Sequence, residues 1–125
     1  MKETKLVFVY GTLLSGLFNN VYLTESNLIG EYETAPEYEM LDNGMYPAIK
    51  EGADKIKGEV YEVDNATMGA LDALESIAYD DYKKEEINIK GVDRPVYIYV
   101  GDKVFKMYDE WKPVANGDYR KHINK

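Results

Sequence analysis

A glycine-bounded loop near the start of the chain has the composition of an anion-binding site. It runs from Gly11 to Gly16 and directly follows the apolar residues 6–10. Glycine adopts backbone angles closed to other residues and lets a ligand approach the main chain, so the N–H groups of this loop could hold a carboxylate or an oxyanion. The alternative is an ordinary tight turn after a buried strand, because glycine marks most turns.

A second candidate group is the carboxyl of Glu75, which falls on the apolar face of the one strong helical pattern, residues 67–77. Three apolar residues recur on that face at helical spacing: Met68, Leu71 and Leu74. Burial disfavours a charged carboxylate and raises its pKa, so an acid in this position suits proton transfer. The alternative is that Glu75 reaches the protein surface or pairs with Lys83 or Lys84.

Other groups of reactive residues lack the pattern of a known site. His122, the single histidine, has only Asp118 nearby, which is too few ligands for a stable metal site, and we expect it to be solvated in a polar tail. Asp80 and Asp81 lack the alternating oxygen ligands of a calcium loop and are expected to form a charged loop. The glycine-bounded loop lacks the continuation of a nucleotide-binding motif. The prediction is therefore no metal and no cofactor.

The composition of the chain narrows the class of partner. Its 125 residues fit a single domain, 1–125, with one site. A formal net charge of −8 disfavours nucleic acid and anionic membranes as partners, and a small-molecule substrate is expected instead. With no cysteine, thiolate nucleophiles and disulfides are excluded. The apolar run near the N-terminus is too short for a signal peptide or a membrane span, so a cytoplasmic location is expected.

Strands are predicted to supply most of the framework that positions these groups. Besides residues 6–10, the strand candidates are 28–35, 38–41, 45–50, 57–63, 85–90, 95–100 and 104–108. Hairpin turns are predicted at residues 42–44 and 101–102, and residues 111–125 are expected to be irregular. Residues 96–100 are apolar on both faces, which favours a closed or strongly curled sheet. Asp64 or Asn65 is expected to cap the helix.

Five blocks, in this order, resemble the γ-glutamylcyclotransferase-like superfamily, which includes γ-glutamylamine cyclotransferases and AIG2-like proteins. They are Val9-Tyr10-Gly11-Thr12-Leu13, Tyr46-Pro47-Ala48-Ile49, Gly58-Glu59-Val60-Tyr61-Glu62-Val63-Asp64, Leu71-Asp72-Ala73-Leu74-Glu75 with Tyr82 shortly after, and Gly117-Asp118-Tyr119. The resemblance spans nearly the whole chain. It implies an α+β fold, a small mixed-strand β-barrel flanked by short helices.

The resemblance also implies roles for individual residues. It makes Glu75 the general acid and base, and it places the substrate-binding pocket at Tyr10, Gly11, Thr12, Leu13, Tyr46 and Tyr82. Four features depart from the family's pattern and leave the substrate open. They are Ser76 where glycine commonly follows the acid, the lack of a proline within residues 77–81, Lys84 in place of an arginine, and Tyr119 in place of a tryptophan.

The reaction implied by this resemblance is the cyclisation of a γ-glutamyl amine or γ-glutamyl amino acid to 5-oxoproline, with release of a free amine. The substrate's own α-amine attacks its γ-carbonyl carbon, so no protein nucleophile is needed, which suits a chain without cysteine. Two alternatives remain: a binding module that captures a small anionic ligand without turnover, and an interaction protein in which Glu75 is simply exposed.

Overall fold

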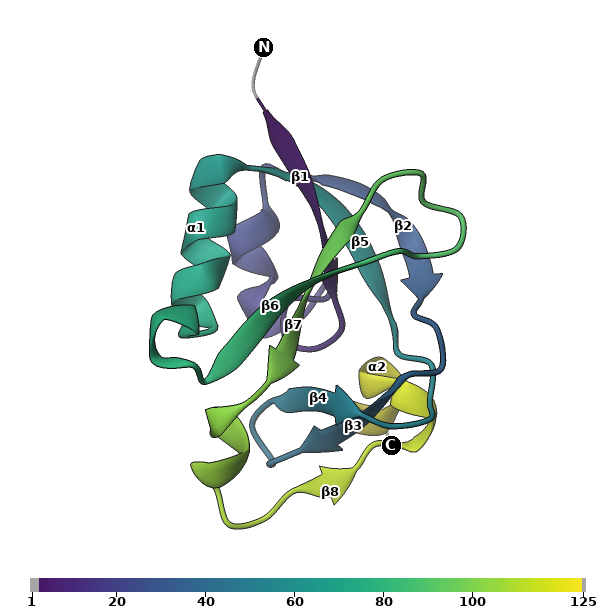
Figure 1. Ribbon diagram of the computed structural model, residues 1–125, viewed down its shortest axis with the longest axis vertical. Helices are drawn as coiled ribbons and strands as arrows, with labels where there is room; N and C mark the ends of the chain where they lie inside the picture. The colour runs from purple at the N-terminus through teal and green to yellow at the C-terminus, as the bar shows by residue number, and fades with distance from the viewer. Residues whose placement is uncertain (1–2, 125) are drawn as a thin grey trace.

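The computed structural model describes residues 3–124, which form an α+β fold built on two β-sheets (Figure 1). The larger sheet has five strands in the order β2–β5–β1–β7–β6, and the smaller has three in the order β4–β3–β8. The strands are β1 Thr4–Val9, β2 Asn27–Glu33, β3 Tyr38–Asp42, β4 Pro47–Glu51, β5 Lys57–Asp64, β6 Tyr82–Ile87, β7 Val96–Gly101 and β8 Lys112–Pro113. The helices are α1 Asn65–Leu74 and α2 Tyr119–Ile123, with short 3₁₀ helices at Phe18–Leu23, Ile77–Tyr79, Lys103–Lys106 and Ala115–Gly117.

Strand β1 is the centre of the larger sheet, as its sequence predicts. Leu6, Val7, Phe8 and Val9 are all buried. Because successive side chains of a strand point to opposite faces, both faces of β1 are covered. The strand pairs antiparallel with β5 and parallel with β7, which confirms a mixed sheet. The parallel pairing brings the carboxyl ends of β1 and β7 to the same edge, the one nearer the smaller sheet in Figure 1.

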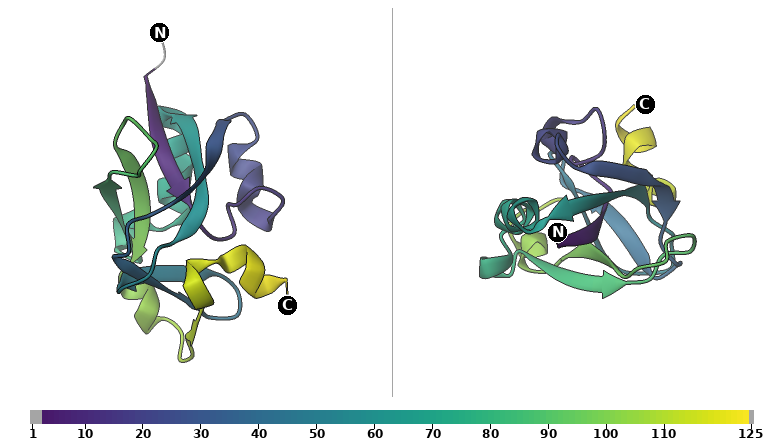
Figure 2. Two further views of the ribbon diagram at one scale, coloured as in Figure 1. Left: turned by 90° about the vertical axis from the view of Figure 1, so that its right-hand side faces the viewer. Right: turned by 90° about the horizontal axis from the view of Figure 1, so that it is seen from above.

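The larger sheet is strongly curled, which confirms one of the two sheet forms predicted from the sequence, but it does not close into the β-barrel that the resemblance implies. Among the described residues, the edge strands β2 and β6 are not paired with each other, so the larger sheet is curled but open (Figure 2). Strand β2 carries a register shift between Leu28 and Gly30, and the centre of β6 is the charged run Lys83-Lys84-Glu85-Glu86. A bulge and a row of charges are features that keep sheet edges from pairing.

Helix α1 begins where the sequence predicts and ends earlier. The Asp64 carboxylate caps it by accepting a hydrogen bond from the backbone N–H of Thr67 at 2.8 Å. The predicted helix continues to residue 77, but α1 ends at Leu74 because Ser76 adopts the left-handed conformation, with φ 52° and ψ 47°. No helix of the described residues has the length and apolar character needed to cross a bilayer.

Two of the predicted strands are placed incorrectly. Strand β6 covers Tyr82–Ile87 and not residues 85–90, because an edge strand rich in charge gives a weak apolar pattern. Residues 104–108 form no strand; they overlap the 3₁₀ helix Lys103–Lys106. The N–H groups of Asp102 and Lys103 donate to the carbonyls of Asp81 and Asp80 at 2.9 and 3.0 Å, and these contacts replace the predicted hairpin. The hairpin predicted at residues 42–44 is confirmed between β3 and β4.

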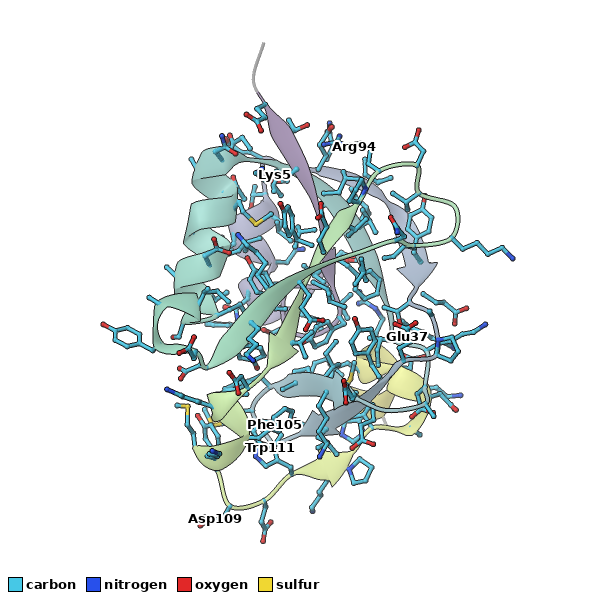
Figure 3. All side chains as sticks on the ribbon, viewed as in Figure 1. Lys5, Glu37, Arg94, Phe105, Asp109 and Trp111 are labelled. Carbon is cyan, nitrogen blue, oxygen red and sulfur yellow. The ribbon has the colours of Figure 1, made fainter. Side chains whose placement is uncertain are left out.

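The C-terminal segment is ordered by contacts with the smaller sheet, contrary to the prediction of an irregular tail. Strand β8 pairs with β3, and Trp111 packs against Phe105 with ring centroids 4.9 Å apart (Figure 3). His122 is not solvated as predicted, since its Nε2 lies 3.0 Å from the carboxylate of Asp42, and both side chains are mostly buried. The segment therefore docks α2 beside the hairpin β3–β4.

Candidate active site

A cavity of about 490 Å³ lies where β1 and β7 end and α1 terminates. Its walls come from the loop after β1, the start of β4, the end of α1, the start of β6 and the end of β7. All seven site residues named from the sequence line this cavity: Tyr10, Gly11, Thr12, Leu13, Tyr46, Glu75 and Tyr82. Segments far apart in the sequence thus meet at one edge of the sheet.

Gly11 is required by close packing within the cavity wall. A Cβ atom at this position would lie 2.6 Å from Cγ and 2.9 Å from Cδ of Pro47, closer than atoms can pack. The left-handed backbone conformation expected of the loop is found at its other end, where Gly16 has φ 81°. The two glycines therefore serve different purposes: Gly11 lets the loop touch β4, and Gly16 lets the chain turn back.

The loop after β1 offers backbone donors to a ligand. Among the hydrogen bonds of residues 3–124, none is donated by the N–H groups of Gly11, Thr12 or Leu13. The acceptors of this loop are engaged, because Asn19 donates from its backbone N–H to the Thr12 carbonyl at 2.9 Å and from its side chain to the Thr12 hydroxyl at 2.8 Å. The free donors line a cavity, which suits the binding of an anionic group.

Glu75 is an acid without a partner in this cavity. Its carboxylate forms no hydrogen bond or ion pair with any other residue of the described chain, and burial raises its pKa to about 7. The lysines considered as partners are bound elsewhere: Lys84 contacts Asp72 at 2.8 Å and Lys83 contacts Asp102 at 3.7 Å. An acid with this pKa can both accept and donate a proton near neutral pH.

Three tyrosines of the cavity use their hydroxyls to fix its walls. The hydroxyl of Tyr10 donates to the backbone carbonyl of Tyr99 at 2.7 Å, and that of Tyr82 donates to the carbonyl of Pro47 at 3.1 Å. Tyr99 in turn donates to the carboxylate of Asp72 at 2.7 Å. Burial raises the pKa of Tyr10, Tyr82 and Tyr99 above the usual range of a phenol, so they remain neutral donors and not bases.

A buried cluster of charged residues, which was not predicted from the sequence, holds the loop that follows β1. Glu59 on β5 is 3% exposed and accepts from Ser15 and from Arg120, the latter at 3.3 Å. Arg120 of α2 also donates to the backbone carbonyl of Ser15 at 2.9 Å. The signal was present in the sequence, since Glu59 shares a strand face with Tyr61 and Val63 and is an acid among apolar residues.

Other residues that line the cavity were not predicted from the sequence as site residues. They are Phe8, Val9, Phe18, Asn19, Met45, Pro47, Leu74, Ser76, Asp81, Tyr99, Val104 and Met107. Asp81, expected in a charged loop, contributes to the cavity wall, whereas its neighbour Asp80 does not. Most of the others carry apolar side chains that a sequence pattern assigns to the core. Within the described part of the chain, no cluster of His, Asp or Glu has the composition of a metal site.

Comparisons with known proteins show the family of this chain. The model of the family "Gamma-glutamyl cyclotransferase, AIG2-like" matches residues 7–121. A Vibrio cholerae protein named "Putative gamma-glutamylcyclotransferase" is 45% identical over 94 residues, which cover 75% of this chain and 81% of that protein. The Escherichia coli protein "Gamma-glutamylcyclotransferase family protein YtfP" is 30% identical over 113 residues, covering 90% and 94% of the two chains.

Solved structures show the same fold. The solution structure of Escherichia coli ytfP superposes with a TM-score of 0.70 at 28% identity and covers 94% of this chain and 98% of that one. The crystal structure of an uncharacterized protein from Pyrococcus horikoshii has a TM-score of 0.79 at 24% identity, with coverage of 96% and 93%. A mouse AIG2-like protein has a TM-score of 0.68 at 19% identity, covering 94% and 95%.

Proposed function

Because the chain belongs to the gamma-glutamyl cyclotransferase, AIG2-like family, we propose that it converts a γ-glutamyl amine or γ-glutamyl amino acid into 5-oxoproline and a free amine. The observation that carries the proposal is Glu75, an unpaired carboxyl with a pKa of about 7 in a cavity whose wall includes free backbone N–H groups. A base and a set of oxyanion donors are what this cyclisation requires of a protein.

Glu75 acts as the base and then as the acid. The α-ammonium group of the substrate first loses one proton to solvent. The neutral nitrogen then attacks the γ-carbonyl carbon and forms the carbon–nitrogen bond of the five-membered ring, and this bond formation makes the nitrogen give up a second proton. Ionised Glu75 takes the proton released from the attacking nitrogen. The protonated carboxyl gives that proton to the departing nitrogen as the original amide bond breaks, so no water is consumed and Glu75 is regenerated.

The N–H groups of Gly11, Thr12 and Leu13 anchor the substrate. They bind either its α-carboxylate or the oxygen of the tetrahedral intermediate, where negative charge develops. Because the attack is intramolecular, the protein needs to hold the substrate in a folded conformation and to position one acid. The hydroxyls of Tyr10 and Tyr82 are already bonded to backbone carbonyls, so they shape the pocket in which the substrate folds.

The alternative function is a binding module for a small anion in the same cavity. Glu75 argues against it, because a partly buried carboxyl beside an anionic ligand weakens binding unless it carries a proton or moves one. An interaction protein with Glu75 at an exposed surface is disfavoured by the burial that raises its pKa.

The proposal is tested by incubating the protein with a panel of γ-glutamyl compounds, including γ-glutamyl-ε-lysine, and detecting 5-oxoproline by mass spectrometry. The matched control is the same panel of α-glutamyl compounds, in which the side-chain carboxylate is free and the cyclisation described above cannot release the amine. We expect equal amounts of 5-oxoproline and free amine from at least one γ-glutamyl compound and neither from the controls. Binding of panel members without release of either product would favour the binding module.

A further inference from the structure

The cavity contains two acids and no basic side chain. Among its lining residues, Glu75 and Asp81 carry carboxyl groups, and none is lysine, arginine or histidine. A cleft lined by charges of one sign concentrates ligands of the opposite sign and repels those of the same sign. Any carboxylate on the leaving amine would therefore meet no cation among these residues.

Asp81 is held in place by its backbone, and its side chain is left free. Its carbonyl accepts hydrogen bonds from the N–H groups of Asp102 at 2.9 Å and Val104 at 3.1 Å, and its own N–H donates to the carbonyl of Ser76 at 3.3 Å. These bonds join the end of β7 to the loop after α1. The carboxylate of Asp81 forms no hydrogen bond or ion pair within residues 3–124.

The lysines near Asp81 are paired with other acids. Lys83 lies 3.7 Å from Asp102, and Lys103 lies 3.8 Å from Asp80. The loop after α1 therefore contains one acid that is paired with a lysine and lies outside the cavity, Asp80, and one that is unpaired and lines it, Asp81. The Asp81 carboxylate is therefore available to pair with a positively charged group of a ligand.

Exposed apolar side chains surround the same cavity. Phe18 is 89% exposed, Met45 67% and Met107 54%, although each contributes to the cavity wall. Large apolar side chains left in water at the edge of a pocket favour a ligand that covers them. The flexible methionines suit an aliphatic chain in particular.

We propose that Asp81 determines the specificity of this site and selects γ-glutamyl amides of aliphatic diamines, in which the far end of the leaving amine is an ammonium group. The aliphatic chain covers Phe18, Met45 and Met107, and the terminal ammonium pairs with the Asp81 carboxylate. The inference rests on the proposed function, because it concerns the leaving group of that reaction. It adds that an amine ending in a carboxylate is a poor leaving group here.

The test compares kcat/KM for three substrates of equal length: the γ-glutamyl amides of a linear diamine, of the corresponding monoamine and of the corresponding ω-amino acid. We expect the diamine derivative to exceed the amino-acid derivative by about tenfold or more, with the monoamine derivative between them. This preference should shrink as salt concentration rises, because the paired charges lie near solvent.

Asp81→Asn is the diagnostic variant, and Asp80→Asn is its matched control. In Asp81→Asn the three kcat/KM values should converge to within about threefold of one another. In Asp80→Asn the three substrates should keep the wild-type order. The thermal midpoint of each variant verifies that it is folded. An unchanged order in folded Asp81→Asn, or equal rates for all three substrates in the wild type, would overturn the inference and leave the proposed function standing. If the wild type releases 5-oxoproline from none of the three substrates and from none of the γ-glutamyl panel compounds, both the inference and the proposed function are overturned.

Discussion

The carboxylate of Glu59 accepts two hydrogen bonds from Ser15, one from its backbone N–H at 2.8 Å and one from its hydroxyl at 2.7 Å. Ser15 belongs to the same loop as the free N–H groups of Gly11, Thr12 and Leu13. The guanidinium of Arg120 adds a third contact to Glu59. A single buried acid therefore joins the proposed anion-binding loop to β5 and to helix α2.

Replacing Glu59 with glutamine should loosen the loop. The amide has one oxygen for the donors that the two carboxylate oxygens now satisfy, and it loses the charge that pairs with Arg120. We expect a loss of about 2–3 kcal/mol in the free energy of unfolding, measured by urea denaturation, and an increase in KM larger than the decrease in kcat. Glu62 lies on the same strand as Glu59 and forms a partly exposed ion pair with Arg94, so Glu62→Gln should lose less stability than Glu59→Gln. Equal losses in both variants would show that Glu59 has no special role.

Ser76→Gly should stabilise the protein. Ser76 adopts a left-handed conformation, which strains any residue with a Cβ atom and suits glycine. The gain is expected to be about 0.5–1 kcal/mol, since glycine also increases the entropy of the unfolded chain. Thermal unfolding of the variant beside the wild type measures it; a lower midpoint would mean that the Ser76 side chain makes a favourable contact that outweighs the strain.

The sequence predicts the strands of the larger sheet other than β6, and the start of α1, because these features are encoded locally. Apolar runs mark β1 and β7, and Asp64 is a standard helix cap. The end of α1 is less visible, since Ser76 stands where a glycine would have signalled the turn. Residues 104–108 have the composition of a strand, but backbone hydrogen bonds to Asp80 and Asp81 fix the preceding turn, and no local pattern reveals such contacts.

Residues of the site can be predicted from the sequence where they depart from the pattern expected of their strand or helix. A glycine directly after a buried strand and an acid on an apolar helix face both stand out, and both line the cavity. Asp81 and Asn19 do not stand out, because polar residues are ordinary in loops and in short 3₁₀ helices. Their positions depend on how the loop after α1 and the 3₁₀ helix Phe18–Leu23 pack around the ends of β1 and β7.

Gly11→Ala should disturb the cavity wall, whereas Gly69→Ala should not. The added methyl at position 11 would lie 2.6 Å from Pro47, while nothing lies within 4 Å of the corresponding position at Gly69 in α1. We expect Gly11→Ala to lose about 1–3 kcal/mol and most of its activity, and Gly69→Ala to gain up to about 1 kcal/mol through higher helix propensity. Full activity in Gly11→Ala would contradict the placement of the loop against Pro47.

The pKa of Glu75 predicts how stability changes with pH. In the folded protein this pKa is about 7, above the ordinary value of 4.5. Between pH 4.5 and pH 7 the Glu75 carboxyl is therefore protonated in the folded state and ionised in the unfolded state. The resulting stabilisation is complete below pH 4.5 and is lost as pH rises through 7. Relative to wild type, Glu75→Gln should gain about 1–3 kcal/mol between pH 5 and pH 8. A difference that stays constant over this range would show that the acid is not buried.

The catalytic role of Glu75 is tested by the pH dependence of 5-oxoproline release by wild type and Glu75→Gln, on whichever γ-glutamyl compound turns over best. If Glu75 is the base, kcat/KM of the wild type rises with pH through an apparent pKa near 7. Folded Glu75→Gln is then slower by about a hundredfold or more and lacks this transition. A Glu75→Gln variant that keeps the wild-type rate and the same pH profile would contradict Glu75 as the catalytic residue.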